Sequence, residues 1–328
     1  MSGIVPELGE VTSTARTELV DPLGRSTVGA EREVRSPILV ATDGSRASGA
    51  ALRIAAALAA RQGRRIEAVV VEETFPITRD GVSIGAETLR QERLPDATQL
   101  GRVRRQLCAI LEADTWNLHV EFGRVGPTIA ELARVHRSPL IVMGLSRHHP
   151  ARRLLGSETA VRVLRSAKVP VLAVASTARE LPHVAVIAVD FSMASVVAAK
   201  AARDLLARPA TLHLIHVRPT LRTAVADIEG WDEIYDAGVT AKLDKLARDV
   251  SGNGVIAYGR IVSGKIAESL LRIAGDVRAG LIACGTDSLN TLERLILGRI
   301  PAQLLRGAEC SVLVAPCART LETQEESR

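Results

Sequence analysis

"GPTIAELARVHRSPLIVMG", residues 126–144, and "GKIAESLLRIAGDVRAGLIACG", residues 264–285, show the same pattern. In each stretch, apolar residues first recur at helical spacing, and a short continuous apolar run then ends in a glycine. A continuous apolar run is typical of a strand that is covered on both faces, whereas a strand with one face in water alternates. A helix followed by a buried strand therefore occurs twice in the chain.

The repeat extends over most of the chain. Residues 37–45, "PILVATDGS", match residues 183–192, "HVAVIAVDFS", and the helix and strand of residues 52–71 match those of residues 200–217. In each unit five strands alternate with helices, which predicts right-handed crossovers and parallel strands. The sequence predicts two tandem doubly wound α/β domains, each a five-stranded parallel sheet of order 3-2-1-4-5 flanked by helices.

The domain boundaries follow from changes in composition. The first residues lack a sustained period and are rich in Gly, Ser, Thr, Pro and charge, which favours a flexible tail. We predict a tail over residues 1–35, a first domain over 36–178, a second domain over 183–318 and a C-terminal tail over 319–328. The mixed polarity from Thr74 to Pro95 predicts a surface excursion within the first domain.

Composition argues against several classes of protein. The 42 Lys and Arg against 37 Asp and Glu give a net charge of only +5, and aromatic residues make up 2% of the chain. A basic stripe with stacking aromatics is absent, so no nucleic-acid partner is predicted. No signal peptide or apolar span is found, so no membrane is predicted. The 4 cysteines form no C-x-x-C pair, which favours a reducing cytoplasm.

The predicted strand order brings two distant residues together. Strands 1 and 4 are neighbours where the winding reverses, and ligands bind outside the carboxyl ends there. Asp43 ends strand 1 and Gly144 ends strand 4. Asp43 forms an Asx turn or N-cap, or is a carboxylate that accepts hydrogen bonds from a ribose or helps to place a cation, or has both roles at once. Gly156 and Ser157 follow at a helix start, which suits an anion but also resembles a capping box.

With these residues placed, the chain resembles the universal stress protein family, as a tandem of two such domains. The family's ATP-binding members carry G-x-x-G, nine residues, and then G-S or G-T between strand 4 and helix 4. The resemblance implies a cytoplasmic stress-response regulatory protein that binds ATP, with Mg²⁺, in its first domain, or a nucleotide-free scaffold that binds a protein partner. It implies that Asp43 lies near the nucleotide, that the Val71 backbone meets the adenine, and that Gly144, Gly156 and Ser157 belong to the phosphate loop.

The first domain departs from the family pattern at one position of that loop. Arg147 replaces the second glycine, and eleven residues separate Gly144 from Gly156 where the family has twelve. The Arg147 side chain either blocks the approach of the backbone to phosphate or contacts the phosphates itself.

The second domain departs further from the pattern. Asp190, Val217 and Gly285 persist, but Ser288 replaces the second loop glycine and Arg299 replaces the hydroxyl residue after Gly298. We therefore expect the second domain to bind nucleotide worse than the first, or not at all.

The last strands of the two domains, residues 169–174 and 311–316, are apolar and would leave sheet edges open. We expect them to pair with each other within the chain or to form a homodimer. No Ser-His-Asp order, G-x-S-x-G elbow or Walker A loop is present, so we predict that the protein is not an enzyme. His213 and His216 are three apart on a strand and face opposite sides, so no shared metal is expected.

Overall fold

The computed structural model describes residues 35–73, 78–79, 82–83, 97–112, 115–145, 153–218, 231–286 and 299–317. The predicted C-terminal tail, and the predicted N-terminal tail up to residue 34, lie outside this part of the chain. None of the helices within it is long and apolar enough to cross a membrane.

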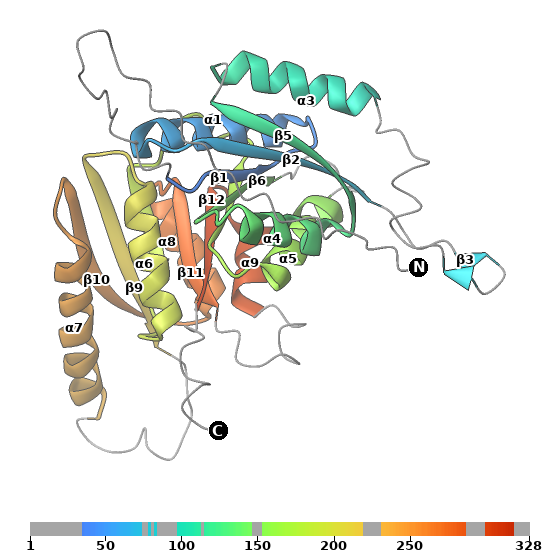
Figure 1. The fold of residues 1–328 in the computed structure, drawn as a ribbon. Helices are drawn as coiled ribbons and strands as arrows, with labels where there is room; N and C mark the ends of the chain where they lie inside the picture. The colour runs from blue at the N-terminus through green and yellow to red at the C-terminus, as the bar shows by residue number, and fades with distance from the viewer. Residues whose placement is uncertain are drawn as a thin grey trace, which may run out of the picture. The chain divides into compact units, whose positions relative to one another are not determined.

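Helices and strands alternate through both repeats, as the sequence predicts (Figure 1). The first repeat contains β1 (Ile38–Ala41), α1 (Arg46–Gln62), β2 (Ile66–Glu73), β3 (Thr78–Arg79), β4 (Val82–Ser83), α3 (Ala97–Ile110), β5 (Trp116–Gly123), α4 (Val125–Val135), β6 (Ile141–Leu145), α5 (Arg153–Ser166) and β7 (Val171–Ala175). The second contains β8 (Val184–Ala188), α6 (Met193–Leu205), β9 (Ala210–Arg218), α7 (Trp231–Val250), β10 (Val255–Ser263), α8 (Ile266–Asp276), β11 (Leu281–Thr286), α9 (Arg299–Gly307) and β12 (Ser311–Pro316). We call these repeats the first half and the second half.

One ten-stranded sheet runs through both halves, in the order β10-β9-β8-β11-β12-β7-β6-β1-β2-β5. Within each half the strands are parallel and follow the order 3-2-1-4-5, so the predicted fold class is confirmed. The halves meet where β7 and β12 pair antiparallel, with Leu172 opposite Leu313. The other two strands, β3 and β4, fall within the predicted surface excursion. They pair antiparallel and form a separate two-stranded sheet.

Helices cover both faces of the large sheet. One hydrophobic core packs α1, α3, α6 and α7 on one face, and a second packs α4, α5, α8 and α9 on the other. Figure 1 shows α4, α5 and α9 grouped together, away from α1 and α3. Because both faces are covered, the central strands β1, β7 and β8 are apolar along their whole length, which explains the continuous apolar runs in the sequence.

Helix α1 shows how local sequence sets the ends of an element. The Ser45 side chain caps its N-terminus by accepting a hydrogen bond from the Ser48 backbone N–H at 3.2 Å. Gly63 ends it in the left-handed region at φ 62°, as the glycine in the sequence predicts. The helix therefore begins directly after the turn that follows β1, close to the predicted crevice.

One predicted helix start differs from the structure. Strand β2 ends at Glu73, where its ladder with β5 ends in the pair Glu73 and Gly123, so Val71 lies two residues before the strand end. Helix α5 begins at Arg153, so Gly156 and Ser157 lie within its first turns rather than at its start. The capping-box pattern that begins at Ser157 therefore does not mark the helix start.

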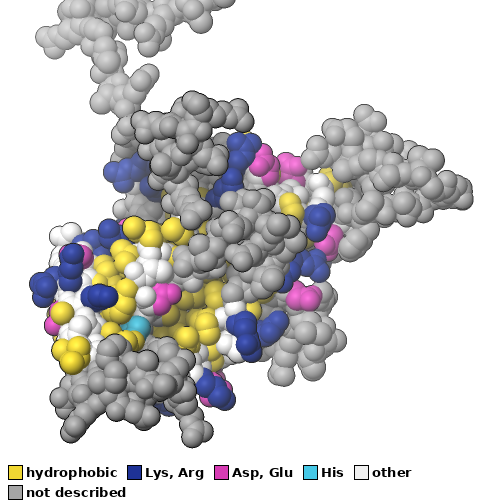
Figure 2. Space-filling view, turned by 90° about the horizontal axis from the view of Figure 1, so that it is seen from below, with side chains coloured by type: hydrophobic (Ala, Val, Ile, Leu, Met, Phe, Trp, Pro, Cys, Tyr) yellow, Lys and Arg dark blue, Asp and Glu magenta, His cyan; other side chains and the backbone are white. Residues whose placement is uncertain are grey.

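Charged side chains are dispersed over the described surface. On the face in Figure 2, Lys and Arg of the described residues are interspersed with Asp and Glu and form no continuous stripe. This distribution agrees with the small net charge of the sequence.

Candidate functional site

Strand register places three of the candidate residues at one edge of the first-half sheet. Ala41 pairs with Val69 of β2 on one side and with Met143 of β6 on the other. Asp43 follows Ala41 by two residues, as Val71 follows Val69 and Leu145 follows Met143, so Asp43, Val71 and Gly144 lie near the carboxyl ends of three neighbouring strands. This edge is the reversal point of the sheet, where open α/β folds bind ligands.

The Asp43 carboxylate shapes the turn between β1 and α1. Its Oδ1 accepts a hydrogen bond from the Ser45 backbone N–H at 2.9 Å, and the residue is exposed. Asp43 thus forms the Asx turn that the sequence suggests, while the capping role belongs to Ser45. Gly44 adopts φ 74°, and Gln106 of α3 donates from Nε2 to the Gly44 carbonyl at 3.2 Å. The turn is therefore held from two sides.

Gly144 lies against the first turn of α1. A Cβ atom added to it would meet the Ala47 carbonyl carbon at 2.5 Å and the Ser48 nitrogen at 2.6 Å. Gly285 has the same surroundings in the second half, where a Cβ would meet Ala194 at 2.4 Å. Both glycines therefore permit strand and helix to approach closely, whether or not a phosphate binds beside them.

The predicted phosphate loop lies largely outside the described residues. Arg147 belongs to the gap between β6 and α5. Gly156 and Ser157 are helical residues of α5, and the structure describes none of their side-chain contacts. The structure therefore places Asp43, Val71 and Gly144 together and leaves the other half of the predicted site as a prediction.

The second half carries an aromatic cluster beside the corresponding turn. Phe191 occupies the place of Gly44 and adopts φ 64°. Its ring lies 5.1 Å from the His216 ring, and Lys242 Nζ lies 5.5 Å from the Phe191 ring centre. His216 is buried, with Nδ1 at 2.8 Å from the Val189 carbonyl oxygen and Nε2 at 2.9 Å from the Tyr235 hydroxyl. His216 is therefore a core residue whose two ring nitrogens are both satisfied.

Two titratable groups beside this turn, Asp190 and Cys284, have shifted pKa values. Partial burial alone would raise the pKa of Asp190, but hydrogen bonds from Ser192 and Ser195 outweigh it and lower the pKa. Cys284 is buried at the end of β11, and burial together with the Asp190 charge raises the pKa of its thiol to about 12. The predicted role of Cys284 as a small core residue agrees with this burial.

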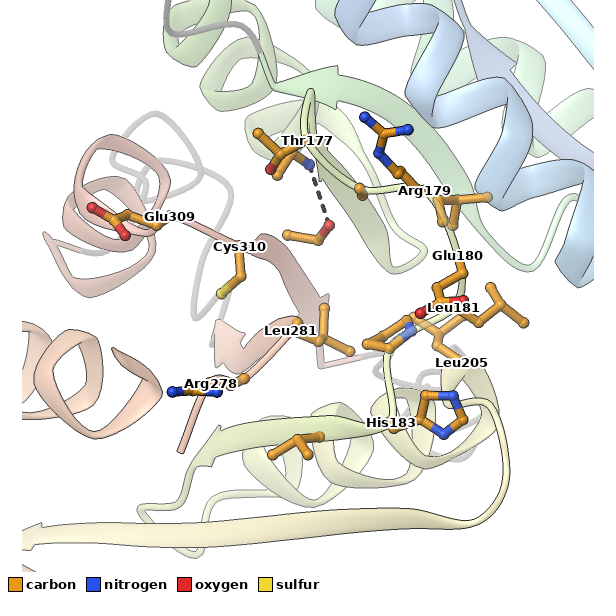
Figure 3. A pocket seen from close by; sticks show the side chains of 18 of the residues that line it. Thr177, Arg179, Glu180, Leu181, His183, Leu205, Arg278, Leu281, Glu309 and Cys310 are labelled. Atoms are coloured by element: carbon orange, nitrogen blue, oxygen red, sulfur yellow. Dashed lines mark hydrogen bonds between the residues drawn. The ribbon is translucent and has the colours of Figure 1, made fainter. Parts of the chain in front are cut away.

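A cavity of about 520 Å³ lies where the two halves are connected. Figure 3 shows Arg179, Glu180 and Leu181 of the connecting segment on one side of it, and Arg278 and Cys310 on the other. It borders the first residues of β8, β11 and β12, so it faces the amino ends of these strands. It is therefore distinct from the crevice at the carboxyl ends.

A polar cluster that the sequence did not predict is formed by Glu67, His119 and His136. Its signal in the sequence is a carboxylate inside the apolar run "RIEAVVV", where a strand covered on both faces would bury it. The histidines lie on β5 and just after α4, and only their contact in three dimensions identifies them.

Comparison with known proteins agrees with the fold. A model of the universal stress protein family matches residues 35–175 and again 183–316. A universal stress protein of Archaeoglobus fulgidus has a similar fold, with a TM-score of 0.55 and 20% identity over 86% of this chain and 96% of that one. A Pseudomonas aeruginosa protein of unknown function aligns with a TM-score of 0.61 and 19% identity over 86% of this chain and 93% of its own.

Sequence relatives match a smaller part of the chain. A Staphylococcus saprophyticus protein that carries the name of universal stress protein is 35% identical over 106 residues, which are 29% of this chain and 60% of that protein. The chain thus matches less than two thirds of that relative's length. Because the family model covers both halves, the chain belongs to the universal stress protein family, with two such domains in tandem.

Proposed function

We propose that the protein is a cytoplasmic stress-response regulator that acts by binding rather than by catalysis, and that its first half holds ATP. The observation that supports this proposal is the strand order, which brings the carboxyl ends of β2, β1 and β6, with Val71, Asp43 and Gly144, to the reversal point of the sheet. A carboxylate can accept hydrogen bonds from a ribose, and the backbone at a strand end can meet the edge of an adenine. The close approach of strand and helix suits phosphates.

The ATP would be held by residues of β2, of α5 and of the turn between β1 and α1. Asp43 would accept hydrogen bonds from the ribose, the Val71 backbone would meet the adenine, and Ser157 would donate its hydroxyl to a phosphate. A Mg²⁺ ion bound with the nucleotide would offset phosphate charge. These contacts are few, so we expect weak binding.

The second half is proposed to serve as a scaffold that binds nucleotide worse or not at all. Phe191 and His216 place two rings beside the second-half turn, at the position that Gly44 occupies in the first half. Ser288 and Arg299 replace loop residues that the family's ATP-binding members carry.

Pairing of β7 with β12 supports a proposal about assembly. The two strands are buried and satisfy each other's backbone within one chain. We propose that this pairing takes the place of a homodimer through the last strands, and that the regulatory partner is another protein, with no nucleic acid or membrane involved.

A nucleotide-free scaffold is the second candidate function. It is favoured by Gly144 and Gly285, because the close approach of strand and helix accounts for both glycines without a phosphate. In that case both crevices would be degenerate, and the chain would act through a protein partner alone.

Calorimetric titration of the full chain with Mg-ATP separates the two candidates. Ser157→Ala should weaken binding about tenfold or more, since a hydrogen bond to a charged group contributes roughly 1.5 to 3 kcal/mol. Ser288→Ala, in the corresponding loop of the second half, is the matched control and should leave the affinity unchanged. Wild-type protein that gives no binding heat at millimolar ATP would favour the scaffold.

Arg147→Gly tests how the arginine in the place of the second loop glycine affects ATP binding. The variant should bind ATP more tightly if the side chain blocks the phosphates, because glycine restores the close backbone approach. It should bind more weakly if the guanidinium contacts them. An unchanged affinity would remove Arg147 from the site.

A further inference from the structure

Glu67, His119 and His136 form a compact polar cluster on the face of the sheet that α4 covers. One ligand atom from each residue lies within 4.8 Å of the others. Glu67 is the second residue of β2, His119 lies on β5 opposite Val69, and His136 is the C-cap of α4. Four residues separate Glu67 from Val71 along the strand, or about 13 Å, so the cluster is separate from the nucleotide crevice.

The Glu67 carboxylate is buried and held in a fixed orientation. Its residue is only 7% exposed, so an ionised carboxylate there needs polar partners. Asn117 Nδ2 donates to Oε1 at 2.9 Å, and His119 Nε2 lies 2.6 Å from Oε2. Asn117 therefore orients one carboxylate oxygen and leaves the other directed at the imidazole.

The two imidazoles lie together beside that oxygen. The ring centres of His119 and His136 are 4.8 Å apart with planes tilted by 50°. Both residues are partly exposed, so an ion can reach them from solvent. Adjacent imidazoles beside a buried carboxylate would repel each other if both were protonated, whereas a bound cation would be coordinated by all three groups.

We propose that Glu67, His119 and His136 bind a divalent transition-metal ion, with Zn²⁺ as the best fit. Two imidazoles and one carboxylate are a ligand set that Zn²⁺ adopts, with a fourth position left for water. Metal–ligand bonds of about 2.0 Å set tetrahedral ligand atoms about 3.3 Å apart, so rotations of the side chains would close the cluster around an ion. The proton between His119 Nε2 and Glu67 Oε2 would leave to solvent as both atoms become ligands.

The second half shows that the fold does not require this cluster. Strand registers place His213 where the first half has Glu67, and Arg260 where it has His119. The C-cap of α8 is Val277 in place of His136. Burial and the Arg260 charge lower the pKa of His213. The Arg260 side chain is a cation in the place of His119 and would repel a metal ion.

The test is a Zn²⁺ titration of the full chain after treatment with a chelator, in the absence of nucleotide and against a chromophoric competitor. Wild-type protein should bind one Zn²⁺ per chain with a Kd in the micromolar range or below. Glu67→Gln, which keeps the shape of the side chain, and His136→Ala should each weaken binding at least about tenfold. His213→Ala is the matched control and should bind as wild type does.

Cobalt replaces zinc in a second measurement that identifies the ligands. The Co²⁺ form should show visible absorption without a thiolate charge-transfer band in the near ultraviolet, because the site contains nitrogen and oxygen ligands only. A thiolate band would assign the ion to cysteine and overturn the proposal. Wild-type protein that binds no Zn²⁺, or unchanged affinity in folded Glu67→Gln and His136→Ala, would overturn it as well.

Discussion

At the scale of single residues, Gly144 is held by packing against α1. Replacing it with alanine would place a Cβ at 2.5 Å from a backbone carbon of Ala47, so the strand or the helix must move. We expect Gly144→Ala to lower the free energy of unfolding by about 1 to 3 kcal/mol, as overpacking does. Urea unfolding followed by circular dichroism measures this change.

Gly275 provides the control for that substitution. It lies near the end of α8, and a Cβ there would meet nothing within 4 Å. Gly275→Ala should therefore leave stability unchanged or raise it by up to about 1 kcal/mol, because alanine has the higher helix propensity. Equal effects of the two substitutions would contradict the packing role of Gly144.

The sequence predicts which residues are neighbours only where the order of the strands determines the contact. Asp43 and Gly144 could be placed together because strand order alone makes β1 and β6 adjacent. His136 could not be placed beside Glu67, because that contact depends on where α4 ends relative to β2 and β5. The distance between these residues along the sequence does not predict where α4 ends relative to the two strands.

At the scale of elements, the strands β7 and β12 join the two halves. Their apolar sequences predict that the edge of each strand is paired with another strand. A strand of the same chain and a strand of a second molecule would satisfy this need equally well. The register that sets Leu313 opposite Leu172 depends on how the connecting segment positions the two halves, so the apolar sequences alone do not predict it. Helix starts were harder to predict still, since α5 begins three residues before Gly156.

Leu313→Ala tests whether the halves are stabilised together. Leu313 is fully buried in the same core as Leu172, so the truncation should lower the free energy of unfolding by about 2 to 5 kcal/mol. In a Trp231→Phe background, the fluorescence of Trp116 on β5 reports on the first half. Its urea midpoint should fall together with the midpoint from circular dichroism. A Trp116 midpoint that does not move would show that the first half unfolds alone.

At the scale of the whole molecule, two copies of one fold have diverged in their side chains. The first half keeps Gly44 at its turn and gathers Glu67 with two histidines, whereas the second half has Phe191 and Arg260 at the corresponding positions. The backbone is thus repeated while the chemistry is not. From this asymmetry we propose that the first half binds the ligand and that the second half serves as a scaffold.

Native mass spectrometry of the intact chain with Mg-ATP measures this asymmetry directly. Asp43→Asn and Asp190→Asn keep an acceptor for the turn and remove the charge at matched positions of the two halves. We predict one ATP per wild-type chain, loss of that ATP in Asp43→Asn and its retention in Asp190→Asn. Two ATP molecules per wild-type chain, or one that only Asp190→Asn removes, would contradict the account.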